Sequence, residues 1–179
     1  MAKVRILGIA PYKGLGELME KTSLDREDIE LHTSIGDLEA AIDLLQKERD
    51  INKYDAIISR GGTAEVIQKK VNIPVIDIKL TEYDMFRSIK LAQIYTGRIA
   101  IVGFPNIMRR ANLICELMQF DIDTYVVRSE EDAEKTIIQL KSQGYSLIVG
   151  DVITVTKAKR YGLNGILITS GQESINEAF

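Results

Sequence analysis

One junction in the sequence has the residue types that hold a small anion. It runs through Ser59, Arg60, Gly61, Gly62 and Thr63, between an apolar run and a segment with helical spacing. Glycines let a ligand approach the backbone closely, and the N–H groups at a helix start favour negative charge. An arginine adds a planar set of donors that suits a carboxylate or a phosphate. The junction therefore predicts an anion-binding site.

The same residues also have a structural interpretation. Serine and threonine commonly cap helices, and a glycine pair can serve only to tighten a turn. For Thr63, capping explains the residue as well as ligand contact does. An arginine in an exposed loop is common, so a ligand role for Arg60 is favoured only modestly. Both interpretations remain open on sequence grounds.

Other apolar runs are also followed by polar, small or aromatic residues. In open α/β sheets ligands bind beyond the carboxyl ends of the strands, which makes these residues candidate ligand contacts. The candidates are Tyr12, Phe104, Asn106, Asp151 and Ser170. Tyr12 and Phe104 could equally anchor their loops. Ser170 with Gly171 and Glu173 resembles a helix start with an acidic first turn, which is a structural role.

The elements that position these residues alternate between short apolar runs and amphipathic segments. Strands are predicted at residues 4–9, 29–32, 56–59, 75–78, 99–102, 124–127, 147–149 and 165–168. Helices are predicted at residues 14–22, from 36, 63–70, 82–95, 107–118, 130–141, 155–161 and from 172. Such alternation produces parallel strands with covering helices, joined by right-handed connections.

The pattern restarts in the middle of the chain. Each half carries four predicted strands, and each half begins with an apolar strand that ends at a proline loop, "IAPY" or "VGFPN". We therefore expect an α/β protein with two similar three-layer α/β/α lobes, each with a four-stranded parallel sheet, and a cleft between them. The expected division is residues 1–80, a crossover helix at 81–97, and a second lobe at 98–179 that includes the final helix.

Composition excludes several classes of protein. The chain has 179 residues with 45% hydrophobic and 27% charged residues, which is typical of globular proteins. A net charge of -3 argues against a nucleic-acid-binding surface. The single cysteine, Cys115, and single histidine, His32, leave no cysteine cage or histidine cluster for a metal. We expect no metal, no cofactor, no membrane span and a cytoplasmic location.

Enzyme motifs are missing from the loops where they would be expected. The chain has no G-x-G-x-x-G turn after a strand, no Walker-type phosphate loop and no G-x-S-x-G elbow. Cys115 lies among apolar residues of a predicted helix and is expected in the core. We favour a binding module without catalytic residues. The alternatives are a small two-lobed isomerase or lyase that uses Asp151 as a base, and a dimerisation module that binds no ligand.

Five segments carry a resemblance that covers essentially the whole chain: "ILGIAPYKGLGELM", "YDAIISRGGTAEVI", "RIAIVGFPN", "LIVGD" and "ILITSGQESI". In order and spacing they resemble the N-terminal sensor domain of the propionate-catabolism activators, the PrpR family of NtrC-type bacterial regulators. The more specific pieces are "ISRGGTA" and "ITSGQESI". The resemblance implies a two-lobed, chelatase-like receptor that binds a small organic acid, 2-methylcitrate in the namesake members.

The resemblance also implies partners and roles. Ser59, Arg60, Gly61, Gly62 and Thr63 would lie in the effector pocket, and the other candidates would line it. Effector binding would relieve inhibition of a following AAA+ ATPase domain, which precedes a helix-turn-helix DNA-binding domain. Since the sequence given ends at Phe179, we expect it to be a piece of a longer regulator rather than a stand-alone sensor. We expect the acid to bridge the lobes and shift an open–closed equilibrium, with a homodimer as a further possibility.

Overall fold

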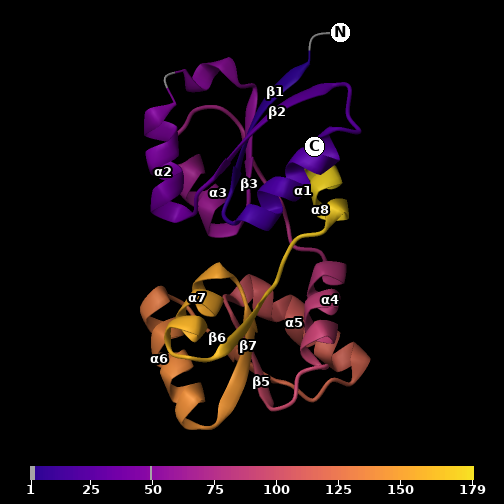
Figure 1. Cartoon of the computed structure of the whole chain (residues 1–179), viewed down its shortest axis with the longest axis vertical. Coiled ribbons are helices and arrows are strands. Elements are labelled where there is room, and N and C mark those ends of the chain that lie inside the picture. The colour runs from indigo at the N-terminus through magenta and orange to yellow at the C-terminus, as the bar shows by residue number, and fades with distance from the viewer. Residues whose placement is uncertain (1–2, 49) are drawn as a thin grey trace. The chain divides into compact units, whose positions relative to one another are not determined.

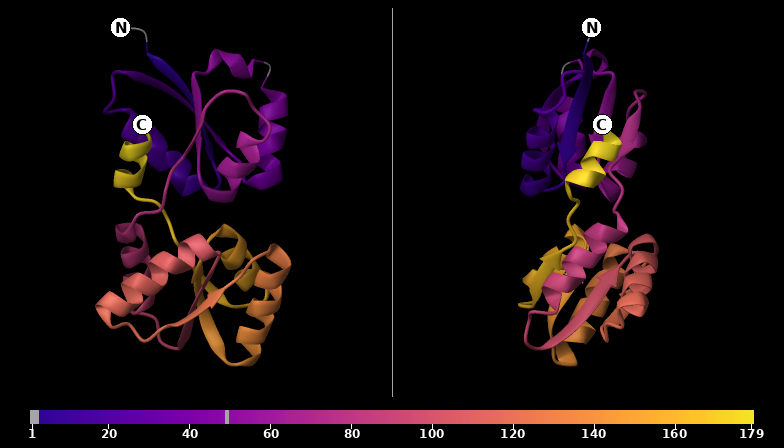
Figure 2. Two further views of the ribbon diagram at one scale, coloured as in Figure 1. Left: turned by 180° about the vertical axis from the view of Figure 1, so that it is seen from behind. Right: turned by 90° about the vertical axis from the view of Figure 1, so that its right-hand side faces the viewer.

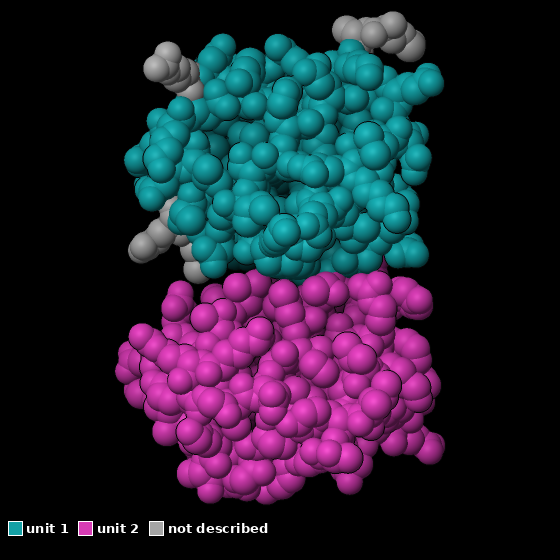
Figure 3. All heavy atoms as spheres, viewed as in Figure 1, with its two compact units in different colours: residues 1–79, 170–179 teal, residues 80–169 magenta. Residues whose placement is uncertain are grey.

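Two separate parallel sheets form in the computed structural model, which describes residues 3–48 and 50–179 (Figure 1). The chain divides into two compact units (Figure 3). Unit 1 comprises the described residues up to Lys79 together with Ser170–Phe179, and unit 2 comprises Leu80–Thr169. The chain therefore passes from one unit to the other twice.

Unit 1 is a three-layer α/β/α sandwich. Its parallel strands are β1 (Val4–Ala10), β2 (Ile29–Ile35), β3 (Ala56–Ser59) and β4 (Val75–Asp77), in the order β2-β1-β3-β4. Its helices are α1 (Lys13–Ser23), α2 (Leu38–Lys47), α3 (Gly61–Gln68) and α8 (Gln172–Ala178), with a 3-10 turn at Ile51–Lys53. The helix α8 lies beside α1 in both views of the ribbon (Figure 1, Figure 2).

The apolar strands of unit 1 are buried on both faces, as expected for a parallel sheet. Ile58 points into one core cluster, which Met19 of α1 and Ile175 of α8 complete. Ile57 points into the cluster on the other face, where Ile67 of α3 covers it. Because β1 and β3 are neighbouring central strands that run parallel, their carboxyl ends lie next to each other.

Unit 2 repeats this architecture. Its parallel strands are β5 (Arg98–Gly103), β6 (Asp123–Val126), β7 (Tyr145–Gly150) and β8 (Asn164–Leu167), in the order β6-β5-β7-β8. Its helices are α4 (Glu82–Ala92), α5 (Pro105–Met118), α6 (Glu130–Ser142) and α7 (Val152–Arg160). Residues of α4 and α5 pack on one face of the sheet, and residues of α6 and α7 on the other.

The predicted α/β class with two four-stranded parallel sheets is confirmed, and each predicted strand forms at or near its expected position. Four helices start one to three residues earlier than expected, among them α3 and α7. The helix α3 begins at Gly61 and α7 at Val152, because Arg60 and Asp151 take the N-cap positions. Within residues 3–48 and 50–179, no helix is long and apolar enough to cross a membrane.

The observed division of the chain differs from the expected one in the placement of two helices, α4 and α8. The segment expected as a separate crossover helix, α4, packs into the core of unit 2 through Met85 and Ile89. The final helix, expected in the second lobe, belongs to unit 1, where Ile175 is buried against α1. The apolar face of α8 therefore finds its partner far away in the sequence.

Candidate functional site

The junction after β3 is firmly built into unit 1. Ser59 is fully buried, and its hydroxyl donates a hydrogen bond of 2.6 Å to the carbonyl of Ile9 in the neighbouring strand β1. The serine side chain therefore ties the carboxyl ends of the two central strands together. It acts here as a support for the residues that follow it.

The glycine pair opens α3. Gly61 has a φ of 54°, a left-handed conformation in which a glycine avoids the strain of a side chain. Its N–H donates to Oδ1 of Asp77 at 2.7 Å, so a carboxylate already sits at this helix start. Thr63 is the third residue of the helix and is buried, so the capping interpretation of Thr63 is wrong.

Arg60, Tyr12 and Ser170 come together at the same end of the sheet, and we call them the Arg60 cluster. Nη1 of Arg60 donates to the hydroxyl of Tyr12 at 2.7 Å, and the guanidinium lies 5.9 Å from the centre of the Tyr12 ring. The backbone N–H of Ser170 donates to the same hydroxyl at 3.3 Å. Three segments far apart in the sequence thus meet at one phenolic oxygen.

One atom of the Arg60 cluster stands out because its hydrogen bonding is incomplete. The side chain of Ser170 is only 4% exposed, and its Oγ has no hydrogen-bond partner among the described residues. A buried hydroxyl without a partner is costly, by about 1–3 kcal/mol, and such groups in folded proteins call for an explanation. A ligand that bonds to this hydroxyl is one explanation.

The candidates of unit 2 occupy matching places after β5 and β7. Asp151 is the N-cap residue of α7, and its Oδ1 accepts bonds of 2.9 Å from both the N–H and the hydroxyl of Thr154. Phe104 is the N-cap residue of α5, and its half-buried ring packs against the core shared with α6 and α7. Asn106 is exposed in the first turn of α5. Asp151 and Phe104 therefore have structural roles at these positions.

Three further features lie outside the Arg60 cluster. Cys115 is buried in the core of unit 2, and burial raises the pKa of its thiol. In the part of the chain that the structure describes, no three His, Cys, Asp or Glu side chains gather into a group able to hold a metal. A hollow of about 270 Å³ on unit 1 contains none of the expected site residues; it is lined by Ile42, Leu45, Gln46, Ile51, Lys70 and Val71.

Two residues that matter here were missed in the sequence. Asp77 ends β4 and reaches the N–H of Gly61, so the rule about carboxyl ends of strands could have identified it. Arg87 lies on α4, and its Nη2 donates to the carbonyl of Thr169 at 3.1 Å. No local pattern connects two residues so far apart along the chain.

The fold and the Arg60 cluster define a two-unit α/β protein with donors gathered at the carboxyl end of one sheet. Comparison with known families adds the identity. The sequence model of the family described as propionate catabolism activator matches residues 25–179, and the chain belongs to this family. The resemblance found in the sequence is thereby confirmed. Arg60 and Ser170 lie inside the matched range, and Tyr12 lies before it.

Solved structures show the same architecture. A crystal structure of an NtrC family transcriptional regulator from Clostridium acetobutylicum is 27% identical, with a TM-score of 0.81, and the match covers 99% of this chain and 94% of that one. A putative LacI family repressor from Corynebacterium glutamicum is 12% identical, with a TM-score of 0.46 and coverage of 98% and 88%.

Proposed function

We propose that this chain is the effector-sensing domain of a bacterial sigma-factor-dependent transcription activator. Membership of the propionate catabolism activator family supports a regulatory role. The similarity to an NtrC family transcriptional regulator over 99% of the chain supports the same class of output. In this proposal the chain senses a small organic acid similar to 2-methylcitrate and performs no chemistry on it.

The Arg60 cluster is the observation that carries the proposal. A guanidinium, a phenolic hydroxyl and a buried, unpartnered serine hydroxyl lie together at the carboxyl end of the sheet in unit 1. An arginine provides directed, charge-assisted bonds to a carboxylate, and hydroxyl groups add donors beside it. The set suits a ligand that carries a carboxylate and at least one further oxygen.

The other residues of the junction have supporting roles in this proposal. Ser59 positions the cluster by tying β3 to β1, and Gly62 and Thr63 place their backbone N–H groups in the first turn of α3. Phe104, Asn106 and Asp151 of unit 2 stay predicted ligand contacts. Two of these three already serve as N-cap residues, so we expect each to contribute less than Arg60.

The proposal also includes an output of sensing. In a full-length regulator the effector would relieve inhibition of a downstream AAA+ ATPase domain, which would act together with a DNA-binding domain. An effector can shift such an equilibrium only by as much as its affinity differs between the two states. A selective effect on activity therefore requires specific contacts, which a charged residue such as Arg60 can provide.

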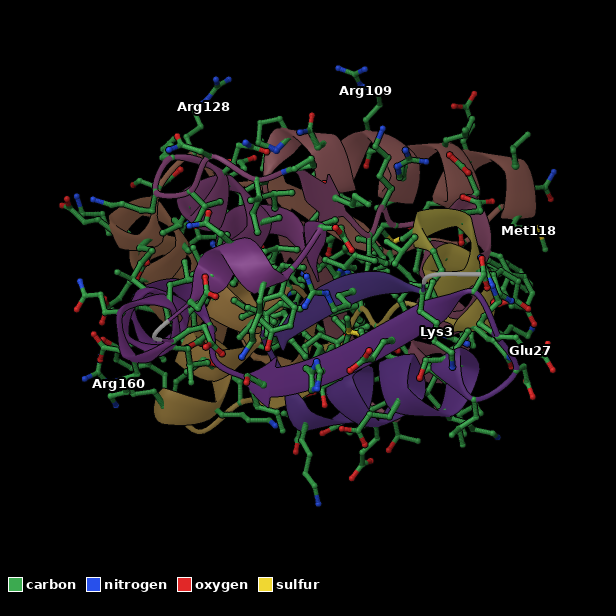
Figure 4. The ribbon with its side chains drawn as sticks, turned by 90° about the horizontal axis from the view of Figure 1, so that it is seen from above. Lys3, Glu27, Arg109, Met118, Arg128 and Arg160 are labelled. Carbon is green, nitrogen blue, oxygen red and sulfur yellow. The ribbon has the colours of Figure 1, made fainter. Side chains whose placement is uncertain are left out.

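The proposal is tested by thermal unfolding with a panel of di- and tricarboxylates that includes 2-methylcitrate and citrate. A ligand that binds the folded state raises the midpoint as its concentration rises. We expect a shift with at least one acid, and its loss in Arg60→Ala. The matched control is Arg109→Ala, because Arg109 is exposed and points away from the ribbon (Figure 4). No shift with any acid would contradict the proposed ligand class.

A further inference from the structure

The chain crosses between the units for the second time at Thr169 and Ser170, and each of these residues takes part in a hydrogen bond within its own unit. On the side of unit 2, Nη2 of Arg87 donates to the carbonyl of Thr169 at 3.1 Å. On the side of unit 1, the N–H of Ser170 donates to the hydroxyl of Tyr12. Each of the two consecutive residues is thus fixed by a side chain of its own unit.

The helix that follows, α8, is short, and its apolar residues pack against the core of unit 1. It spans only Gln172–Ala178, and isolated helices of this length are not stable in water. Ile175 is its fully buried apolar anchor in the core of unit 1. Beyond its last residue, Nη2 of Arg26 donates to the carbonyl of Phe179 at 3.4 Å. Because a helix this short depends on its tertiary contacts, the hydrogen bond from Ser170 to Tyr12 just before it contributes to how firmly α8 is docked.

The hydroxyl of Tyr12 links this helix to the proposed ligand site. The same oxygen accepts a bond from Arg60 and a bond from the backbone of Ser170. We propose that Tyr12 is a positioning residue that couples Arg60 to the docking of α8, a regulatory role that rests on the proposed function of the Arg60 cluster. In the full-length regulator proposed above an output domain would follow this helix, so the coupling would start the route by which the effector signal leaves unit 1.

The direction of the coupling follows from the chemistry of a hydroxyl group. With Arg60 and Ser170 as donors, both lone pairs of the Tyr12 oxygen are used and its hydrogen remains to be donated. A carboxylate that accepts this hydrogen polarises the group and makes its oxygen a better acceptor, because linked hydrogen bonds strengthen one another. Ligand binding should therefore hold Ser170, and with it α8, more firmly.

Hydrogen exchange of the ligand-free 179-residue chain tests the docking. In Tyr12→Phe the amides of α8 should exchange about 3- to 10-fold faster, the loss expected for one hydrogen bond. Tyr54→Phe is the matched control, because it removes another unit 1 hydroxyl, one that lies 3.4 Å from a Glu48 oxygen. Ile175→Ala shows the rate for a released helix, and β3 amides report whether unit 1 stays folded. Unchanged α8 exchange in Tyr12→Phe would overturn the proposal.

A double-mutant cycle tests the coupling itself. Arg60→Ala should also speed α8 exchange, by about 2- to 5-fold, because Tyr12 loses the bond that orients it. In the Tyr12→Phe background the same Arg60 change should have no further effect. Additive effects of the two changes would contradict a relay through Tyr12. This cycle needs no ligand, so its outcome is separate from failure of the organic acid panel.

Adding 2-methylcitrate at a concentration that saturates each variant gives the final arm. The wild-type chain should show slower α8 exchange with the acid, and Tyr12→Phe should not. Binding without any change at α8 in the wild-type chain would leave the sensor proposal standing and refute the coupling.

Discussion

The two units place a charged residue at the same point of the same sheet topology, and the charges are opposite. The strand order β2-β1-β3-β4 in unit 1 corresponds to β6-β5-β7-β8 in unit 2. Arg60 follows β3 as the N-cap residue of α3, and Asp151 follows β7 as the N-cap residue of α7. Likewise Tyr12 caps α1 after β1, and Phe104 caps α5 after β5.

The difference shows that the same strand order can place side chains with different hydrogen-bonding roles at equivalent junctions. Asp151 accepts the N–H and hydroxyl of Thr154, so the end of unit 2 is stabilised by its own side chain. The side chain of Arg60 has no acceptor for the N–H groups at the start of its helix. It donates instead to the hydroxyl of Tyr12, which also accepts the N–H of Ser170. In unit 2 the residue at the strand-to-helix junction bonds within its own helix, whereas in unit 1 donors gather at the equivalent place. We therefore propose that unit 1 contributes most to recognition of the acid.

The largest expected difference between the units is in stability when each junction glycine is replaced by alanine. A Cβ at Gly150 would lie 2.5 Å from the carbonyl of Val102 and clash with Oγ1 of Thr154. Gly150→Ala should lower the free energy of unfolding by about 3 kcal/mol. A Cβ at Gly61 meets nothing within 4 Å, so Gly61→Ala should cost only the strain of its positive φ, about 1 kcal/mol. Urea unfolding of both variants measures this, and equal losses would contradict the difference in packing around the two glycines.

A smaller effect separates the cap of unit 2 from its charge. Asp151→Ala removes the acceptor for the N–H of Thr154 and should destabilise the chain by about 1 kcal/mol. Asp151→Asn keeps an acceptor of the same shape and should cost much less. The midpoint of thermal unfolding compares the two variants. Equal losses with asparagine and alanine would show that the carboxylate charge, and not the cap, is what matters.

The smallest predicted effect concerns the carboxylate beside the proposed ligand site. Asp77→Asn keeps an acceptor for the N–H of Gly61 and removes a negative charge from the end of unit 1. Binding of a carboxylate effector should become about 2- to 5-fold tighter, as expected for one exposed charge, and the gain should shrink at high salt. Titrations at two salt concentrations measure it. Weaker binding in Asp77→Asn would mean that the carboxylate itself helps to bind the ligand.

Much of the fold could be predicted because its strands are short apolar runs with clear ends. A short apolar run such as "AIIS" at β3 is typical of a buried strand, and the alternation with helices predicts that the strands are parallel. The position of α8 could not be predicted in this way. Its association with unit 1 depends on Ile175 reaching the core beside α1, a contact between opposite ends of the chain.

The types of residue in the candidate site could be predicted from the sequence, but the hydrogen-bond partners of these residues could not. The rule about carboxyl ends of strands identified Arg60, Tyr12 and Ser170 separately, and they form one cluster in unit 1. The same rule also selected Asp151, which a local hydrogen bond to Thr154 accounts for. Sequence spacing does not show which polar residue is satisfied by its own helix and which is left to meet another segment.

Isothermal titration of 2-methylcitrate into three proteins tests the central claim most directly: the wild-type chain, Arg60→Ala and Arg109→Ala. Loss of charge-assisted bonds to a carboxylate should weaken binding to Arg60→Ala by about 10- to 100-fold. Arg109→Ala removes the same charge from an exposed position and should bind as the wild-type chain does. Equal affinities of the wild-type chain and Arg60→Ala would contradict recognition of the acid by the Arg60 cluster.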